Sequence, residues 1–185
     1  MLAPRVNEYV IEAEEVARHA LPGQFIILRA DDEGERIPFT ICDYDRQKGT
    51  VTILVQEVGY STAKLAEVPE GGFIADFVGP LGKPTDLAGY KKIALVGGGI
   101  GCAVIYPQAK KLHAEGVCCD VIAGARTREL IMYENEFRAN CDCLMITTDD
   151  GSYGVKGFVT DALKEGLDRG KYDLCLLYTS DAADD

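Results

Sequence analysis

The chain of 185 residues is long enough for one large domain or two small ones. Apolar residues make up 47% and charged residues 26%, which is typical of a soluble globular protein with a buried core. The formal net charge of −11 argues against a nucleic-acid or anionic-membrane partner. The sequence shows no apolar run near the roughly 20 residues of a membrane-spanning helix and no signal-peptide pattern, so we expect a cytoplasmic location.

Seven cysteines and two histidines limit the possible metal and redox chemistry. No two cysteines have C-x-x-C spacing, and Cys118 and Cys119 lie inside an apolar strand pattern. We therefore expect buried, reduced thiols rather than disulfides, and no histidine-based metal site.

Residues 5–80 alternate between short apolar runs and turn signals. The runs cover residues 9–13, 25–29, 37–42 and 50–56. Strands at this spacing indicate an antiparallel sandwich or barrel.

After Gly82-Lys83-Pro84 the pattern changes to alternating strands and helices. Strands are predicted at 93–96, 117–123 and 143–147, and helices at about 103–115, 128–139 and 157–167. This is the βαβ pattern of a parallel sheet. We predict two domains, an antiparallel β-barrel over residues 1–84 and a Rossmann-like α/β unit over residues 90–174.

Four glycines follow the first predicted parallel strand, at Gly97, Gly98, Gly99 and Gly101. A strand, a glycine turn and a helix allow the backbone and the helix N–H groups to approach a pyrophosphate. Cys102 stands where the common dinucleotide fingerprint has its third glycine. Such turns also occur without a ligand, but this placement favours dinucleotide binding.

Several strings in order resemble one family. They are PGQF, ERIPFTI, QEVGYST, GPLGKP, VGGGIG, GAR and TTDDGSYGVKGFVTD, between about Leu2 and Leu174. They are similar to electron-transfer flavoprotein subunits of the ferredoxin–NADP reductase superfamily. Within it, the chain resembles the dihydroorotate dehydrogenase electron-transfer subunit and the small subunit of NADH-dependent ferredoxin:NADP oxidoreductase, also called sulfide dehydrogenase. The resemblance implies an FAD-binding barrel and an NAD-binding α/β half.

The segment Glu35 to Ile41 resembles the flavin-facing strand of the superfamily. The resemblance places Arg36, Pro38, Phe39 and Thr40 at the FAD, with arginine on the pyrophosphate and the threonine hydroxyl near flavin N5. Strand alternation puts Arg36, Pro38 and Thr40 on one face. Arg36 stands one place earlier than in the commonest superfamily pattern. From the residues alone, an edge strand with a proline and a solvated arginine is the favoured interpretation.

Two further segments of the first domain match the family. Gly59, Ser61 and Thr62 end a strand and begin a helix, with Ser61 or Thr62 as a candidate N-cap. The resemblance implies that this helix start holds the FAD pyrophosphate, although alone it is only a capped helix. Gly79 lies in the turn out of the barrel, near the flavin in relatives.

Three polar residues follow later strands of the α/β half. Arg126 comes after the second strand, where the adenosine ribose normally lies, and Arg128 and Glu129 nearby leave NAD and NADP both open. Asp149 and Asp150 follow the third strand and could accept hydrogen bonds from ribose hydroxyls. From composition alone they are a solvated turn.

Residues Cys175 to Asp185 match a reading-frame translation of a transposon-type sequencing adapter, so we predict an adapter-derived tail. The gene would then be cut near Leu174, inside a strand, leaving an exposed sheet edge. The family's nicotinamide-pocket segment and its four-cysteine [2Fe–2S] site have no counterpart in this sequence. Met1 need not be the native start.

The resemblance implies an FAD-dependent subunit that passes electrons from NADH or NADPH through a [2Fe–2S] cluster to a partner. The partner would be a dihydroorotate dehydrogenase-like or a ferredoxin-linked, glutamate synthase-like subunit. No acid–base pair is needed, because the cofactor supplies the reactivity. The alternatives are an NAD-dependent dehydrogenase without flavin and a nucleotide-binding module without turnover.

Overall fold

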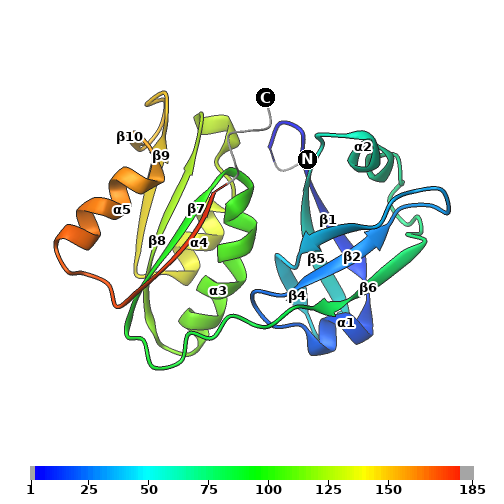
Figure 1. The fold of residues 1–185 in the computed structure, drawn as a ribbon, viewed down its shortest axis with the longest axis horizontal. Helices are drawn as coiled ribbons and strands as arrows, with labels where there is room; N and C mark the ends of the chain where they lie inside the picture. Colours follow the sequence, from blue (N-terminus) through cyan, green and yellow to red (C-terminus); the bar gives the residue numbers. More distant parts are fainter. Residues whose placement is uncertain (1–2, 180–185) are drawn as a thin grey trace. The chain divides into compact units, whose positions relative to one another are not determined.

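The computed structural model describes residues 3–179 (Figure 1). The chain divides into two compact units, residues 1–85 and residues 86–185, which are described separately. Within residues 3–179, no helix is both long and apolar enough to cross a membrane.

The described residues of unit 1, from 3 to 85, form six strands and two short helices. They are β1 (Val6–Glu12), α1 (Glu14–His19), β2 (Phe25–Arg29), β3 (Ile37–Thr40), β4 (Asp43–Asp45), β5 (Thr50–Gln56), α2 (Tyr60–Ala66) and β6 (Asp76–Leu81). The strands form two antiparallel three-stranded sheets, in the orders β1-β5-β4 and β3-β2-β6. The predicted all-antiparallel N-terminal domain is confirmed.

One apolar core fills unit 1. Alternate residues of β2 and β5 point inward and are almost completely buried, namely Ile26, Leu28, Val51, Ile53 and Val55. Alternation of this kind is what buries one face of an antiparallel strand. The helix α1, with only six residues, was missed by the sequence analysis because it shows too few turns for a periodic pattern.

Unit 2 alternates strands and helices. Its elements are β7 (Lys92–Gly98), the 3₁₀ turn η1 (Gly99–Gly101), α3 (Cys102–Ala114), β8 (Cys118–Ala125), η2 (Arg128–Leu130), α4 (Glu134–Asn140), β9 (Cys143–Thr148), β10 (Val155–Lys156), α5 (Val159–Asp168) and β11 (Leu174–Thr179). The sheet is parallel, in the order β10-β9-β8-β7-β11. The predicted parallel α/β half is confirmed.

Helices cover the sheet of unit 2. Helix α5 packs Val159 and Leu163 against Ala94, Val96 and Ile122 of the central strands. Helices α3 and α4 contact each other, and α3 also lies against β7 and β8. The central strands are buried on both faces, which explains why 93–96 reads as a continuous apolar run.

The single helix predicted over about 128–139 is wrong. The structure has a 3₁₀ turn over Arg128–Leu130 and a separate helix that begins at Glu134. Tyr133 between them adopts a left-handed conformation, with φ of 59°. A left-handed residue cannot continue an α-helix, so the chain turns there.

The last described strand, β11, lies at the edge of the sheet beside β7. Its pairing runs from Leu174↔Ile93 to Thr179↔Gly98, so the strand extends beyond Leu174 into the segment predicted to be adapter-derived. The origin of that segment stays a prediction, and its residues 180–185 lie outside the described residues. In this structure the edge next to β7 is therefore paired.

Candidate functional site

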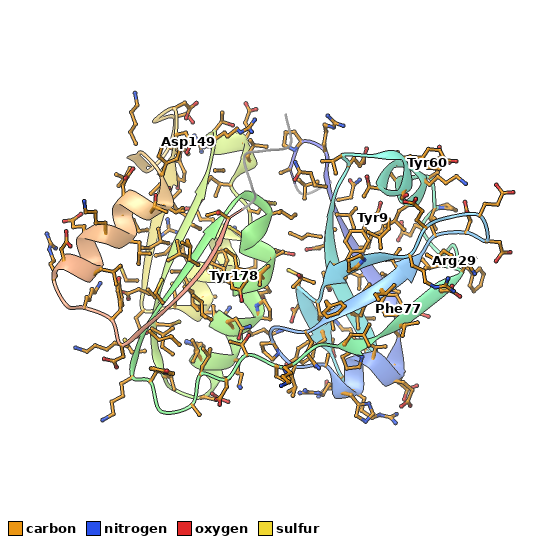
Figure 2. All side chains as sticks on the ribbon, in the orientation of Figure 1. Tyr9, Arg29, Tyr60, Phe77, Asp149 and Tyr178 are labelled. Atoms are coloured by element: carbon orange, nitrogen blue, oxygen red, sulfur yellow. The ribbon has the colours of Figure 1, made fainter. Side chains whose placement is uncertain are left out.

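The loops of unit 2 that carry the predicted nucleotide-binding residues meet at one edge of the sheet. Gly98 is paired with Gly124, and Gly124 is paired with Thr147. Because the strands are parallel, their carboxyl ends lie side by side, and Figure 2 shows Asp149 at this end of β9. The structure therefore brings the glycine turn, Arg126, Asp149 and Asp150 to a common edge.

The strand order makes this edge a switch point. The chain leaves β7 through α3 to reach β8 on one side, and later returns to β11 on the other side of β7. In open α/β sheets, ligands bind outside the carboxyl ends of strands at such a point. The glycine turn after β7 lies at that position.

The glycines of this turn allow neighbouring parts of unit 2 to pack closely against its backbone. A Cβ on Gly101 would lie 2.2 Å from the carbonyl oxygen of Tyr178, and one on Gly97 would lie 3.0 Å from the backbone nitrogen of Cys102. Gly99 has a φ of +56°, which favours glycine. The strand, turn and helix predicted from the sequence are thus present, with no room for side chains at two of the glycines.

Gly101→Ala is expected to lower the free energy of unfolding by about 1–3 kcal/mol, because overpacking against backbone forces the turn or β11 to move. Gly101 has an ordinary φ of −59°, so the cost is steric. Gly98→Ala is the neighbouring control, since its Cβ would meet only the Thr179 side chain at 3.2 Å. Urea denaturation of both variants measures the difference, and equal stability of the two would contradict the close approach of Gly101 to β11.

Cys102 occupies the place of the third fingerprint glycine and is buried under the turn. Its Sγ lies 3.6 Å from the carbonyl oxygen of Gly97, toward which it donates a weak hydrogen bond. Burial raises the pKa of the Cys102 thiol to about 12. The side chain therefore acts as a small apolar residue that packs the helix against the strand.

The expectation of buried thiols holds for only part of the set. All seven cysteines are reduced, and Cys42, Cys102 and Cys119 are buried, but Cys118 and Cys143 are exposed. Cys118 is the first residue of β8 and Cys143 is the first residue of β9, so both lie at solvent-exposed ends of strands.

We expect iodoacetamide to label Cys143 in the folded protein while leaving Cys102 unmodified. Exposure permits attack at Cys143, whereas Cys102 is inaccessible and its pKa of about 12 leaves almost no thiolate at neutral pH. Mass spectrometry of peptides before and after denaturation in urea measures this. If Cys102 of the folded protein were labelled as fast as Cys143, the buried position of Cys102 would be contradicted.

A network of side chains fixes the loop that follows β9. The Thr148 hydroxyl accepts a hydrogen bond from the Tyr153 N–H at 3.0 Å and donates one to the Tyr153 carbonyl oxygen at 2.6 Å. The Tyr153 hydroxyl donates to Glu134 at 2.7 Å, and the Arg128 guanidinium lies over the Tyr153 ring, 5.0 Å from its centre. The loop after β8 is thereby tied to the loop after β9.

The charges at this edge are mixed. Hydrogen bonds from Arg138 and Tyr153 lower the pKa of Glu134, and those from Ser152 lower the pKa of Asp150. Asp149 and Asp150 are exposed, as is Arg126. The edge thus offers carboxylates for hydroxyl groups and a guanidinium for a phosphate, which agrees with the mixed signal in the sequence.

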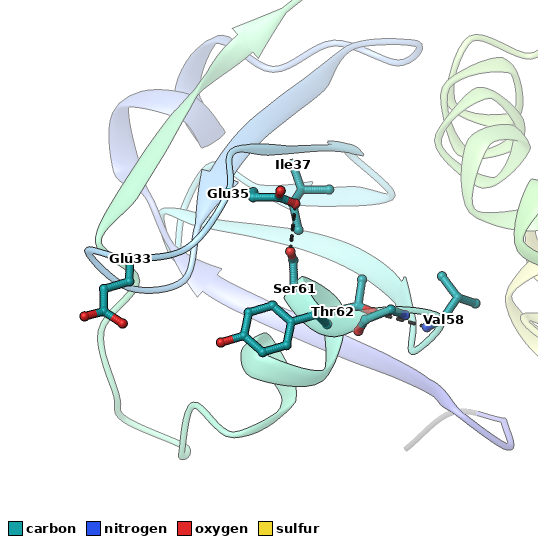
Figure 3. Close-up of a pocket in the computed structure, with 8 residues that line it drawn as sticks. Glu33, Glu35, Ile37, Val58, Ser61 and Thr62 are labelled. Atoms are coloured by element: carbon teal, nitrogen blue, oxygen red, sulfur yellow. Dashed lines mark hydrogen bonds between the residues drawn. The ribbon is translucent and has the colours of Figure 1, made fainter.

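A pocket of about 490 Å³ lies in unit 1, between α2 and the segment that leads into β3 (Figure 3). Its lining residues all belong to these two segments. They are Glu33, Glu35, Ile37, Val58, Gly59, Tyr60, Ser61 and Thr62. Three predicted site residues, Gly59, Ser61 and Thr62, therefore line one pocket. The other five lining residues were not singled out from the sequence.

The predicted N-cap of α2 is wrong by two or three positions. Gly59 is the N-cap, in an extended conformation, and Ser61 and Thr62 lie inside the first turn. The Thr62 hydroxyl oxygen accepts from the N–H groups of Val58 and Gly59, both at 3.1 Å, and donates to the Gly59 carbonyl oxygen at 2.9 Å. This hydroxyl therefore closes the turn ahead of the helix and fixes the wall of the pocket.

The residues predicted on β3 have different surroundings. Pro38 is exposed and Thr40 half-buried, while Phe39 packs against the core of unit 1 and adjoins the buried Ile41. The predicted alternation is therefore observed. It leaves Thr40 accessible from the side of the strand that faces away from the core.

Arg36 is engaged by a carboxylate of the same unit. Its guanidinium lies 2.7 Å from Asp76 Oδ2, and Arg29 contacts the same oxygen at 2.7 Å. The guanidinium groups of Arg29 and Arg36 lower the pKa of Asp76. A phosphate that recruited Arg36 would have to compete with Asp76.

Gly79 lies in the middle of β6 and not in the predicted turn, and a Cβ there would meet the Cγ2 atom of Ile26 at 2.6 Å. It is needed for packing of β6 on β2.

Among residues 3–179, no group of three or more His, Cys, Asp or Glu side chains is arranged to hold a metal ion.

The fold is that of a ferredoxin-reductase-like protein. A chain from the structure of NADH-dependent reduced ferredoxin-NADP oxidoreductase superposes with a TM-score of 0.91 and 38% sequence identity. The match covers 97% of the present chain and 64% of that chain. No family model matches the sequence.

Sequence relatives point to the same class. The chain is 40% identical over 174 residues to the Thermotoga maritima homologue of the dihydroorotate dehydrogenase B (NAD(+)) electron transfer subunit, covering 94% of this chain and 61% of the relative. It is 48% identical over 176 residues to a Clostridium beijerinckii protein described as "uncharacterized protein in adh 3′ region", covering 90% of this chain and 60% of the relative. The chain is thus homologous to electron transfer subunits of dihydroorotate dehydrogenase B, and spans about 60% of the length of these two relatives.

The sequence analysis missed residues that reach the site from neighbouring loops. Glu33 and Glu35 line the pocket in unit 1. In unit 2, the hydrogen bond between Tyr153 and Glu134 anchors the loop after β9. Their positions depend on which loops fold together, which spacing along the chain does not reveal. For Tyr153, the string TTDDGSYG contained a signal, because an aromatic residue in a polar loop often serves as an anchor.

Proposed function

We propose that this chain is the cofactor-binding part of an FAD-dependent electron-transfer subunit, which passes electrons between NADH or NADPH and a partner subunit. The match to the structure of NADH-dependent reduced ferredoxin-NADP oxidoreductase carries this proposal, because it extends through both units at 38% identity. The partner would be a dihydroorotate dehydrogenase-like or a glutamate synthase-like subunit. A [2Fe–2S] cluster would be held by residues outside this sequence.

The two units offer residues that fit two nucleotides. In unit 2, the glycine turn lies between the carboxyl end of β7 and the start of α3, which is where the pyrophosphate of a dinucleotide binds in sheets of this kind. Arg126, Asp149 and Asp150 lie at the same edge and would contact the ribose groups of the nicotinamide nucleotide. Arg128 would join them only if it left its stacking position on Tyr153.

In unit 1, the FAD would be held by β3 and by the start of α2. Thr40 is accessible from one side of β3, and Gly59, Ser61 and Thr62 line a pocket of about 490 Å³. Arg36 and Pro38 would border the flavin from the same face of β3 as Thr40, while Phe39 and Gly79 would support that sheet through their packing on the core side. FAD would supply the conversion of a hydride into single electrons, and the chain's own residues would bind and orient the two nucleotides.

The proposal is tested by measuring the binding of FAD and of NADH to the purified chain, each by fluorescence titration. Thr40→Val is expected to weaken FAD binding about fivefold, as for the loss of one hydrogen bond. Thr52→Val on β5 is the matched control, because Thr52 is also a half-buried strand residue of unit 1, and it should leave FAD affinity unchanged. Binding of NADH without FAD would instead favour a flavin-free dehydrogenase or a nucleotide-binding module.

A further inference from the structure

The pocket in unit 1 is lined by acidic side chains on one side. Glu35 faces the start of α2, whereas Glu33 lies at the other end of the lining with its carboxylate pointing away from Ser61 (Figure 3), and none of the described residues that line the pocket is basic. Both glutamates are exposed to solvent. A phosphate group entering the pocket would therefore meet two negative charges of the protein and no compensating cation in the lining.

The basic residues closest in sequence to the pocket are held by other carboxylates. Lys64 Nζ lies 2.8 Å from Asp31 Oδ2, and it also sits 5.4 Å from the centre of the Tyr60 ring. Arg36 is bound to Asp76 at 2.7 Å. Neither cation can move to a phosphate without giving up an ion pair.

Glu35 also accepts a hydrogen bond from a hydroxyl group that lines the pocket. The Ser61 hydroxyl donates to Glu35 Oε2 at 3.1 Å (Figure 3). Thr62 cannot replace it, because its hydroxyl already donates to the Gly59 carbonyl oxygen and accepts from two N–H groups. Ser61 is thus the hydroxyl that can turn toward a ligand, and Glu35 competes for it.

We propose that Glu35 is a specificity-determining residue that weakens the binding of phosphate-bearing ligands in this pocket, by its charge and by its hold on the Ser61 hydroxyl. This rests on the proposed function, in which the pyrophosphate of FAD lies against the start of α2. Binding of FAD then requires Glu35 to release Ser61 and to withdraw from the phosphate. Glu33 contributes charge but has no hydrogen bond to Ser61 in the structure, so its effect is the smaller of the two.

The test compares the FAD dissociation constants of the wild-type chain, Glu35→Gln and Glu33→Gln at one ionic strength. We expect Glu35→Gln to bind FAD about tenfold more tightly and Glu33→Gln no more than about threefold, on the scale of one removed charge a few ångströms away in water. Glutamine keeps an oxygen that can accept from Ser61, so Glu35→Gln measures the effect of the charge, whereas Glu35→Leu also frees the Ser61 hydroxyl. In a Ser61→Ala background, any further gain of Glu35→Leu over Glu35→Gln should disappear. Melting temperatures should stay the same, because an exposed hydrogen bond of this kind adds little stability.

The outcomes separate the inference from the proposed function. If the wild-type chain binds FAD but Glu35→Gln binds it no more tightly, or no more tightly than Glu33→Gln, the inference is wrong and the proposed function stands. If Glu35→Gln binds FAD and the wild type does not, the inference is supported in its strongest form. If neither protein binds FAD, the inference and the proposed function are both wrong.

Discussion

Phe137→Ala is expected to lower the free energy of unfolding by about 3–5 kcal/mol, the usual range for truncating a fully buried phenylalanine. Phe137 is 0% exposed and lies on α4, where its ring meets Tyr106 and Tyr133 edge-to-face at 5.9 and 6.4 Å. Alanine would leave a cavity beside the two tyrosine rings and remove both ring contacts. Because α4 carries Glu134, which anchors Tyr153, the loop at the nucleotide edge should loosen as well.

Phe73→Ala is the matched control, because the Phe73 side chain is 93% exposed. It should change the free energy of unfolding by less than about 0.5 kcal/mol. Chemical denaturation in urea, followed by circular dichroism, measures both variants. A loss below about 1 kcal/mol for Phe137→Ala would contradict the packing of α4 against α3.

Gly154→Ala should have a comparable effect, in the loop after β9. The residue has a φ of +65°, and an added Cβ would lie 2.3 Å from the carbonyl oxygen of Ile146. The left-handed conformation costs about 1–2 kcal/mol for a non-glycine residue, and the clash with backbone adds about 1–3 kcal/mol. The loop would shift, so we also expect NADH binding to weaken.

Gly170→Ala separates the two contributions, because Gly170 has a similar φ of +61° with nothing within 4 Å of its Cβ. It should therefore cost only about 1–2 kcal/mol and leave NADH binding unchanged. Thermal denaturation and NADH titration of the two variants provide the comparison. Equal losses in both would show that Ile146 does not restrict the position of Gly154.

The sequence predicted the architecture because its signals are local. Strand alternation in residues 50–56 and the apolar run at 93–96 each depend on which face of a strand is buried, and the structure has strands β5 and β7 there. The change from strands alone to alternating strands and helices likewise separated an antiparallel from a parallel sheet. What failed was the helix over 128–139, because the left-handed Tyr133 interrupts it and no glycine or proline marks that position.

The candidate site was predictable only in part. Glycine turns and polar residues at strand ends can be read along the chain, and the structure gathers Gly97, Gly101, Arg126 and Asp149 at one edge. The pairing of Glu35 with Ser61 and of Arg36 with Asp76 joins residues 26 and 40 positions apart. Such contacts depend on how loops fold over the sheet, which periodicity does not encode.

The proposed function requires that this chain bind FAD and a nicotinamide nucleotide together and that a hydride pass between them. The most direct measurement is an anaerobic titration of the FAD-reconstituted protein with NADH, followed by the visible absorption of the flavin. We expect the flavin band to bleach in proportion to the NADH added, and the flavin of the Gly154→Ala protein to need higher NADH concentrations than that of the Gly170→Ala protein. Flavin bound to the protein that stays oxidised in excess NADH and in excess NADPH would contradict the proposed function.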